Sequence, residues 1–250
     1  MNFFLQGFQF ENLKHANFEN CEFITKFHAS CTPNLEELNL RLCRNFVEID
    51  ASIGLLNKLK RFYLSHCSKL QFLPSQLRLK SLNTFYLSYC PRLEKLPEIH
   101  PEMECLEVLL LSSSGIKLMP ACNPLDGFWM MRELYLNNCE NIVELDFLMK
   151  PDCFPKLERL DLCGTKIITV PESLSRFPRL WSLSVENCKQ LREIQGLPQS
   201  IERVYARKCE QLREIQGVLI KWVDARDSIL LDTQSLLNQV CFSFFLFFLS

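Results

Sequence analysis

The 250-residue chain lacks several features that mark common protein classes. It has only seven glycines and a formal net charge of −1 at pH 7. It contains no Gly-x-x-x-x-Gly-Lys-Ser/Thr stretch, no Cys-x-x-Cys pair and no Asn-x-Ser/Thr sequon. The first of these motifs is the P-loop, and without it the chain lacks the glycine-rich loop that binds nucleotide phosphates. A near-zero net charge gives no support to general nucleic-acid binding. We therefore expect no cofactor and no nucleic-acid partner.

Long apolar runs and secretory signals are also lacking. The apolar run at residues 240–249 is shorter than the roughly 20 residues that a membrane-spanning helix needs. The segment Met1 to Gly7 has neither a basic region nor enough apolar residues for a signal peptide. These absences argue against a membrane protein and favour the cytoplasm, with the nucleus as a second compartment.

Cysteine, by contrast, is abundant, with 13 residues. In a short secreted chain this number would indicate disulfides, but seven of the cysteines recur in one register, described below. The other six, Cys31, Cys105, Cys122, Cys153, Cys163 and Cys241, show no regular pairing and no metal-ligand spacing. We expect free thiols, a reducing compartment and no metal site.

A short pattern returns nine times: an apolar residue, two variable, an apolar, one variable, an apolar, two variable, and usually cysteine. Clear copies are Leu35-x-x-Leu38-x-Leu40-x-x-Cys43 and Leu59-x-x-Phe62-x-Leu64-x-x-Cys67. The ninth positions, 21 to 26 residues apart, are Cys21, Cys43, Cys67, Cys90, Ser114, Cys139, Thr165, Cys188 and Cys209. A unit this short cannot bury its own apolar face, so the copies must stack.

Alternating apolar residues at the fourth and sixth positions predict a strand in each copy. Amphipathic helices would need apolar residues at i, i+3, i+4 and i+7 instead. Prolines such as Pro74 and Pro97 follow the strands, so the return side is not a regular strand. We predict an α/β repeat solenoid: a leucine-rich-repeat horseshoe with a parallel concave sheet and a mostly irregular or short-helical convex side. The small ninth side chain should fill the corner, buried, and bond to backbone groups.

The same register predicts the organisation of the chain. Residues 1–9 form an N-terminal extension, and residues 10–217 form a leucine-rich-repeat domain of about nine repeats. Residues 218–239 leave the pattern and are expected to be a C-terminal cap or the start of another domain. The apolar tail, residues 240–250, is expected to be disordered or artefactual.

Several stretches resemble the repeat region of plant intracellular immune receptors of the TIR-NBS-LRR type. They are Phe10 to Lys14, Pro33 to Leu40, Cys67 to Pro74, Gly164 to Ile167 and Leu197 to Ile201. The resemblance extends over about residues 10–238. Complete members carry a TIR domain and a nucleotide-binding ATPase domain, and neither is present here, so no catalytic residue carries over. The resemblance implies the sensor portion of such a receptor, either a fragment or a truncated paralogue.

The variable strand positions predict a binding face. Neighbouring strands lie about 4.8 Å apart, which makes Tyr63 and Tyr86 adjacent rungs. Tyr, Trp and Arg are enriched at interface hot spots, although aromatic residues also suit strands in general. The candidate protein-binding residues form three clusters: Arg61, Tyr63, His66, Tyr86 and Tyr89; Tyr135, Arg159, Asp161 and Trp181; and Arg203 and Tyr205, beside Arg207 and Lys208. His66 and Cys67 cannot act together, because adjacent strand residues point to opposite faces.

The sequence favours a non-enzymatic recognition module. It would bind a pathogen-derived or host protein, and in a full-length receptor it would also pack on the nucleotide-binding domain. Two other classes stay open: a stand-alone adaptor or scaffold, such as the substrate-recognition part of a ubiquitin ligase, and a secreted receptor ectodomain. An upstream F-box-like helical segment would favour the adaptor, and the missing sequons argue against the ectodomain.

The register predicts which side chains carry stability. Leu64→Ala or Leu136→Ala should lower the free energy of unfolding by about 2–5 kcal/mol, because each leaves a cavity in the core. The same change at Arg61 or Arg159 should cost less than about 1 kcal/mol. Chemical denaturation measures both, and equal losses at the two kinds of position would refute the register.

Overall fold

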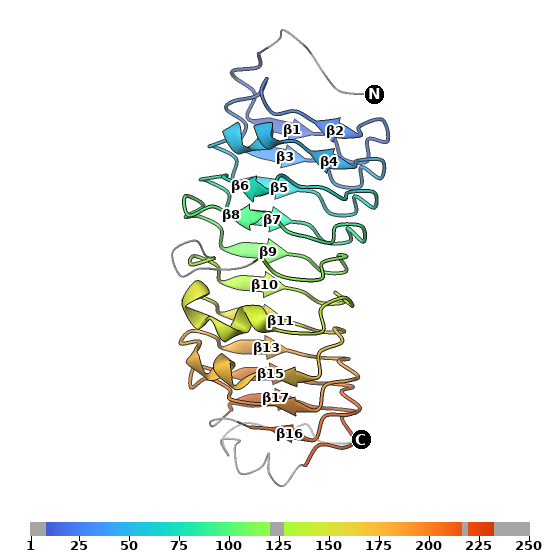
Figure 1. Ribbon diagram of the computed structural model, residues 1–250, viewed down its shortest axis with the longest axis vertical. Coiled ribbons are helices and arrows are strands. Elements are labelled where there is room, and N and C mark those ends of the chain that lie inside the picture. The colour runs from blue at the N-terminus through green and yellow to red at the C-terminus, as the bar shows by residue number, and fades with distance from the viewer. Residues whose placement is uncertain (1–8, 121–127, 217–219, 233–250) are drawn as a thin grey trace.

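The computed structural model describes residues 9–120, 128–216 and 220–232, which form one stack of coils (Figure 1). Each coil contributes one short parallel strand to a ten-stranded sheet, so we number the coils 1 to 10 from the N-terminus. The strands of this sheet are β1 (His15–Asn17), β3 (Glu37–Asn39), β5 (Arg61–Tyr63), β7 (Thr84–Tyr86), β9 (Val108–Leu110), β10 (Glu133–Tyr135), β11 (Arg159–Asp161), β13 (Ser182–Ser184), β15 (Arg203–Tyr205) and β17 (Trp222–Asp224).

Every strand of this sheet spans the third to fifth positions of the repeat, and the register does not slip. Leu38 lies opposite Phe62, and Phe62 lies opposite Phe85. In the first nine strands the central residue is buried and its two neighbours are more exposed, because side chains alternate along a strand. In β17, at the end of the stack, Val223 is half-buried and Asp224 is buried. Phe62 and Phe85 stack inside with ring centroids 5.3 Å apart. The predicted parallel sheet of stacked repeats is confirmed.

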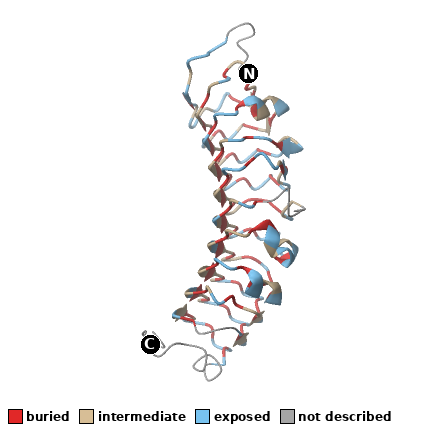
Figure 2. Ribbon diagram, turned by 90° about the vertical axis from the view of Figure 1, so that its left-hand side faces the viewer, coloured by how far each residue is buried: buried red, intermediate tan, exposed pale blue. Residues whose placement is uncertain are grey.

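The rest of each coil returns through short strands and 3₁₀ turns. The shorter parallel strands are β2 (Lys26–Phe27), β4 (Glu48–Ile49), β6 (Gln76–Leu77), β8 (Glu98–Ile99), β12 (Thr169–Val170), β14 (Glu193–Ile194) and β16 (Glu214–Ile215). The 3₁₀ helices are η1 (Ala51–Leu55), η2 (Asp146–Met149), η3 (Pro151–Cys153) and η4 (Glu172–Arg176). They lie opposite the ten-stranded sheet, and the stack bows gently toward the sheet side (Figure 2). In the described part of the chain, no helix is long and apolar enough to span a bilayer.

Each coil turns its corner through a residue with positive φ at the eighth repeat position. These residues are Asn20, Leu42, His66, Tyr89, Ser113, Asn138, Gly164, Asn187, Lys208 and Asp227, with φ between 56° and 66°. In this conformation the eighth N–H still donates to the next coil, as from Leu42 to the Ser65 carbonyl at 2.9 Å. Gly, Asn and Asp adopt the left-handed region readily, whereas other residues are strained there.

The ninth side chain ties each coil to the one before it. The Cys43 Sγ donates to the Phe18 carbonyl at 3.0 Å, and the Cys67 Sγ donates to the Leu40 carbonyl at 3.1 Å. Cys90, Cys139, Cys188 and Cys209 repeat this bond, and Ser228 makes it through its hydroxyl at 2.6 Å. We call Cys43, Cys67, Cys90, Cys139, Cys188 and Cys209 the corner cysteines. All six are buried, which confirms the predicted packing role of the ninth residue.

Burial also determines the chemistry of the corner cysteines. It raises the pKa of each thiol, and those of Cys90 and Cys209 reach about 12. The thiols therefore stay protonated at neutral pH and serve as hydrogen-bond donors, not as nucleophiles.

The repeats extend further than expected from the sequence. The segment Ile220-x-x-Val223-x-Ala225-x-x-Ser228 follows the repeat register, and β17 pairs in parallel with β15. A tenth coil therefore lies in the segment that was expected to be a cap or the start of another domain. Its ninth position is serine, as in coil 5.

Two expectations about cysteine are wrong. Cys21 occupies the ninth position of coil 1 but is partly exposed, since only one neighbouring coil packs against it. Cys153 is buried in η3, outside the repeat register, and is disulfide-bonded instead of free. The predicted tail at residues 240–250, Cys122, Cys241 and most of the N-terminal extension lie outside the described residues.

The left-handed corner predicts a stabilising substitution. Lys208 is exposed with φ of 57°, so Lys208→Gly should relieve backbone strain and raise the free energy of unfolding by about 0.5–1 kcal/mol. Lys189 is also exposed but has no positive φ, so Lys189→Gly should be destabilising by a similar amount. Urea denaturation of both variants measures the difference. A loss of stability in Lys208→Gly would contradict the corner geometry.

Candidate functional site

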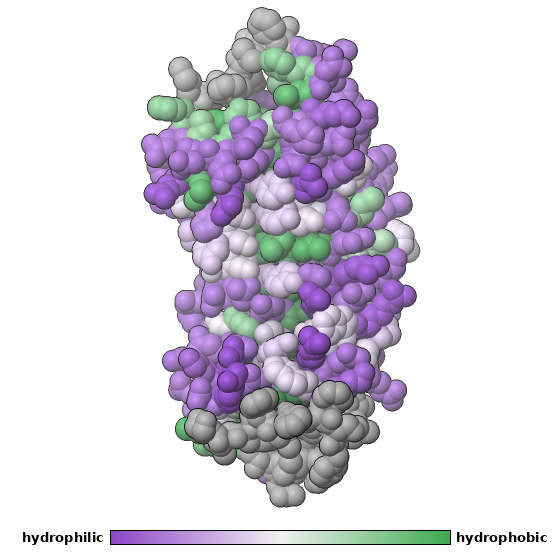
Figure 3. Space-filling model, turned by 180° about the vertical axis from the view of Figure 1, so that it is seen from behind, coloured by the Kyte–Doolittle hydropathy of each residue, from purple (hydrophilic) through white to green (hydrophobic). Residues whose placement is uncertain are grey.

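The outward face of the ten-stranded sheet is the concave face of the stack. Figure 3, which views the molecule from behind, shows a pale and green band along the middle of this face between purple margins. In the central coils the fifth repeat positions hold tyrosine or leucine, and the third position of coil 5 holds valine. This distribution divides the face into regions of different chemistry.

The first predicted cluster is centred on a stacked tyrosine pair. Tyr63 on β5 and Tyr86 on β7 are in register, and their rings stack at 4.4 Å with an interplanar angle of 18°. Partial burial, followed by the nearby Tyr86, raises the pKa of Tyr63. Arg61, at the base of the cluster, donates to Glu37 at 2.6 Å. The pair is thus ordered before any partner binds.

Exposed ion pairs run along the second and third repeat positions on both sides of this region. In coils 1 to 3, Glu36 bridges Lys14 at 3.2 Å and Lys60 at 2.8 Å, and these lysines lower the pKa of Glu36 to about 2. In coils 6 and 7 the pairs are Arg132 with Glu158 at 3.1 Å and Arg159 with Glu133 at 3.5 Å. Opposite charges on neighbouring rungs favour this register, although each exposed pair stabilises the fold only slightly.

The ion-pair series is interrupted in the middle of the concave face. At the second and third positions, coil 4 has Asn83 and Thr84 and coil 5 has Glu107 and Val108. No salt bridge joins these positions to their neighbours within the described residues. Tyr63, Tyr86, Leu110 and Tyr135, which occupy the fifth positions from coil 3 to coil 6, are all half-buried. We call this row of four uncharged side chains, from Tyr63 to Tyr135, the central patch.

His66 and Tyr89 lie at the corner, not on the strands as expected. Both are eighth-position residues with positive φ, and their rings stack at 4.3 Å with an interplanar angle of 7°. Burial, followed by the positive charges of Arg41 and Arg44, lowers the pKa of His66. Cys67 is turned into the core, so His66 and Cys67 cannot act as a pair, although the reason is the turn and not strand alternation.

The second and third predicted clusters are joined through Trp181. The Arg159 guanidinium lies 4.7 Å from the centre of the Trp181 ring, and the Arg203 guanidinium lies 5.5 Å from it. Trp181 belongs to coil 8 and the two arginines to coils 7 and 9, so the indole lies between two cations. Tyr135 donates to Glu133 at 2.7 Å. Partial burial, followed by this bond, raises the pKa of Tyr135.

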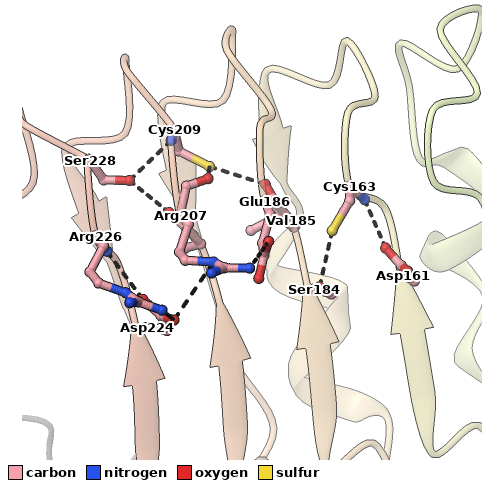
Figure 4. A network of polar contacts seen from close by, with 11 residues as sticks. Asp161, Cys163, Ser184, Val185, Glu186, Arg207, Cys209, Asp224, Arg226 and Ser228 are labelled. Atoms are coloured by element: carbon pink, nitrogen blue, oxygen red, sulfur yellow. Dashed lines mark hydrogen bonds and ion pairs between the residues drawn. The ribbon is translucent and has the colours of Figure 1, made fainter. Parts of the chain in front are cut away.

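The remaining predicted residues have local partners. Asp161 accepts a bond from the Cys163 backbone N–H at 3.0 Å, so its carboxylate stabilises the turn after β11 (Figure 4). Arg207 pairs with Glu186 at 2.8 Å and with Asp224 at 3.7 Å (Figure 4). Asp161 and Arg207 therefore support the edge of the face.

The described residues hold no metal-binding cluster, and the Cys163 thiol among them is not activated. They contain no group of three or more His, Cys, Asp or Glu side chains that could hold a metal ion. The Cys163 Sγ lies 3.0 Å from the Ser184 hydroxyl, but burial and the Asp161 carboxylate raise the pKa of this thiol. A nucleophilic cysteine needs the opposite shift.

Sequence reasoning missed Trp222 and Val108. Trp222 contacts Tyr205 with ring centroids 4.6 Å apart, and it was overlooked because coil 10 was not recognised. The spacing of Ile220, Val223 and Ala225 was the available signal. Val108 was overlooked because only the fifth positions were compared along the stack.

The comparisons with known proteins agree with this architecture. No protein-family model matches the chain. TMV resistance protein N from Nicotiana glutinosa is 31% identical over 169 residues, 68% of this chain and 12% of that protein. Disease resistance protein RPP2A from Arabidopsis thaliana is 30% identical over 170 residues, 68% of this chain and 9% of that protein. Disease resistance-like protein DSC1 from Arabidopsis thaliana is 28% identical over 189 residues, 63% of this chain and 15% of that protein.

The chain therefore spans a small part, 9–15%, of the length of these relatives. Among solved structures, the leucine-rich repeat domain of the type III effector XopL has a TM-score of 0.51 at 16% identity, over 78% of this chain and 70% of that domain. At that identity the likeness concerns the fold alone. The chain is a leucine-rich-repeat solenoid, and its homologues are plant TIR-NBS-LRR disease resistance proteins.

Proposed function

We propose that the chain is a non-enzymatic protein-recognition module of a plant innate immune receptor, and that it binds a pathogen effector or a host protein on its concave face. Homology to plant disease resistance proteins supports a role in a plant immune receptor. The observation that carries the proposal is the central patch, where Tyr63 and Tyr86 stack beside the interruption in the ion-pair series.

The central patch has the physical properties of an interface core. Tyrosine provides a large contact area with few rotatable bonds, so it loses little side-chain entropy on binding. Stacking removes part of that cost in advance because Tyr63 and Tyr86 already hold each other in place. The flanking ion pairs form a polar rim, and a polar rim around a less charged centre is the usual composition of protein interfaces.

In a full-length receptor the module would also pack on the nucleotide-binding domain and help to hold it inactive. A partner that binds the open state more tightly than the closed state shifts the population toward signalling. The receptor would act in the cytoplasm, with the nucleus as a further site of action.

The Tyr63→Ala, Tyr86→Ala double variant should lose at least about tenfold in partner binding, because hot-spot aromatics contribute roughly 1–2 kcal/mol or more each. Proteins that co-purify with the tagged full-length receptor from pathogen-challenged leaf tissue are quantified for wild type and variant, together with the defence response.

The matched control is Phe23→Ala with Phe72→Ala, which removes two exposed aromatic residues away from the ten-stranded sheet. The control should retain the partners and the response. If the tyrosine variant keeps every partner and signals normally, the central patch is not the recognition surface.

A further inference from the structure

The C-terminal end of the concave face carries a second region, distinct in chemistry from the central patch. Glu202, Arg203, Tyr205, Lys221 and Trp222 line a hollow of about 420 Å³ between coils 9 and 10. This volume lies near the lower end for ligand sites, so the hollow has room for a side chain or two and not for a large cofactor.

Aromatic rings form one side of the hollow. Tyr205 and Trp222 contact each other with centroids 4.6 Å apart and an interplanar angle of 58°. Both side chains are half-buried, so each has ring surface left for a ligand. This side is suited to an apolar group.

Arg203 provides the charge. Its guanidinium lies over the Trp181 ring, which Arg159 also approaches from the neighbouring coil. This contact restricts the long Arg203 side chain, and the same side chain lines the hollow.

Arg203 differs from the other cations nearby. Arg159 pairs with Glu133, Lys221 pairs with Glu202, and Arg207 pairs with Glu186. Over the described ranges, no salt bridge to a carboxylate is found for Arg203. Glu202 lies close enough for the Arg203 charge to contribute to its lowered pKa, but its carboxylate bonds to Lys221. A held guanidinium without a direct ion pair, next to exposed ring surface, is complementary to a carboxylate attached to an apolar neighbour.

We propose that this hollow binds an aspartate or glutamate that lies beside an apolar residue in an extended segment of a protein partner. Arg203 donates to the carboxylate, and Tyr205 and Trp222 cover the apolar neighbour. The proposal rests on the concave face being the recognition surface, and it specifies the chemistry of the partner at the C-terminal coils.

The test uses the whole chain with isotopically labelled tryptophan, whose three indole N–H signals come from Trp129, Trp181 and Trp222. Two blocked peptides serve as probes: acetyl-Gly-Glu-Leu-Glu-Gly-amide and the same peptide with Gln in place of Glu. The acidic peptide should shift the Trp181 and Trp222 signals and leave the Trp129 signal in place. The Gln peptide should bind about fivefold more weakly, which corresponds to one exposed ion pair, and added salt should reduce the difference.

Arg203→Gln should abolish the discrimination between the two peptides. Arg213→Gln is the matched control, because Arg213 is exposed next to β16, away from the concave face, and it should discriminate as wild type does. An unchanged Trp129 signal shows that a variant keeps its fold. Arg203→Lys is a second variant, which retains the positive charge at this position.

Equal affinity for the two peptides, no shift with either peptide, or full discrimination in Arg203→Gln would overturn the proposal. Such results would leave recognition by the central patch standing, because Tyr63 and Tyr86 lie in other coils and are tested separately. Conversely, peptide discrimination with no effect of the tyrosine variant on partner binding would overturn the central patch alone.

Discussion

The fold depends on the hydrogen bonds that join successive coils where the chain turns the corner. A turn would normally interrupt the ladder between parallel strands. Here the eighth residue adopts a left-handed conformation, so its N–H still reaches the next coil. The ninth side chain then donates back to the preceding coil. Thr165 occupies the ninth position of coil 7, where most coils have cysteine. Its hydroxyl donates within its own coil, to the Leu162 carbonyl at 2.7 Å, and not to the coil before.

Because core and corner positions carry stability, the outward strand positions are free to vary. Some of them carry alternating charges that favour the register of neighbouring coils, as in the Lys14, Glu36 and Lys60 series. Others carry the central patch and the Arg203 hollow. The strained corner residues His66 and Tyr89 lie next to the central patch. The same left-handed conformation recurs in every coil, so the corner itself requires it.

The sequence was sufficient for the parts of the structure that depend on spacing alone. Residues such as Leu38, Phe62 and Cys67 recur at fixed intervals, and stacking then determines the sheet, its register and the core. Coil 10 was missed because Ser228 follows Cys209 at a shorter interval than separates any other two successive ninth positions. The position of Tyr89 was predicted wrongly because spacing does not show where a strand ends and a left-handed turn begins.

The contacts of the candidate site were harder to predict than its residues. That Tyr63 and Tyr86 are neighbours follows from the register and is confirmed, and the structure adds that their rings stack. The link through Trp181 does not follow from the register, because it depends on how far the side chains of Arg159 and Arg203 reach across coils. The interruption of the ion pairs becomes visible only when the second and third positions of all coils are compared in space.

The corner bonds can be tested directly by maleimide labelling of the native chain, followed residue by residue with mass spectrometry. Cys105 is exposed and free, whereas the corner cysteines are buried, protonated and hydrogen-bonded. Cys105 should react at the rate of an accessible thiol, and the corner cysteines should react only when denaturant unfolds the stack. Labelling of Cys67, Cys90 and Cys139 in the native chain at the Cys105 rate would contradict this account of the fold.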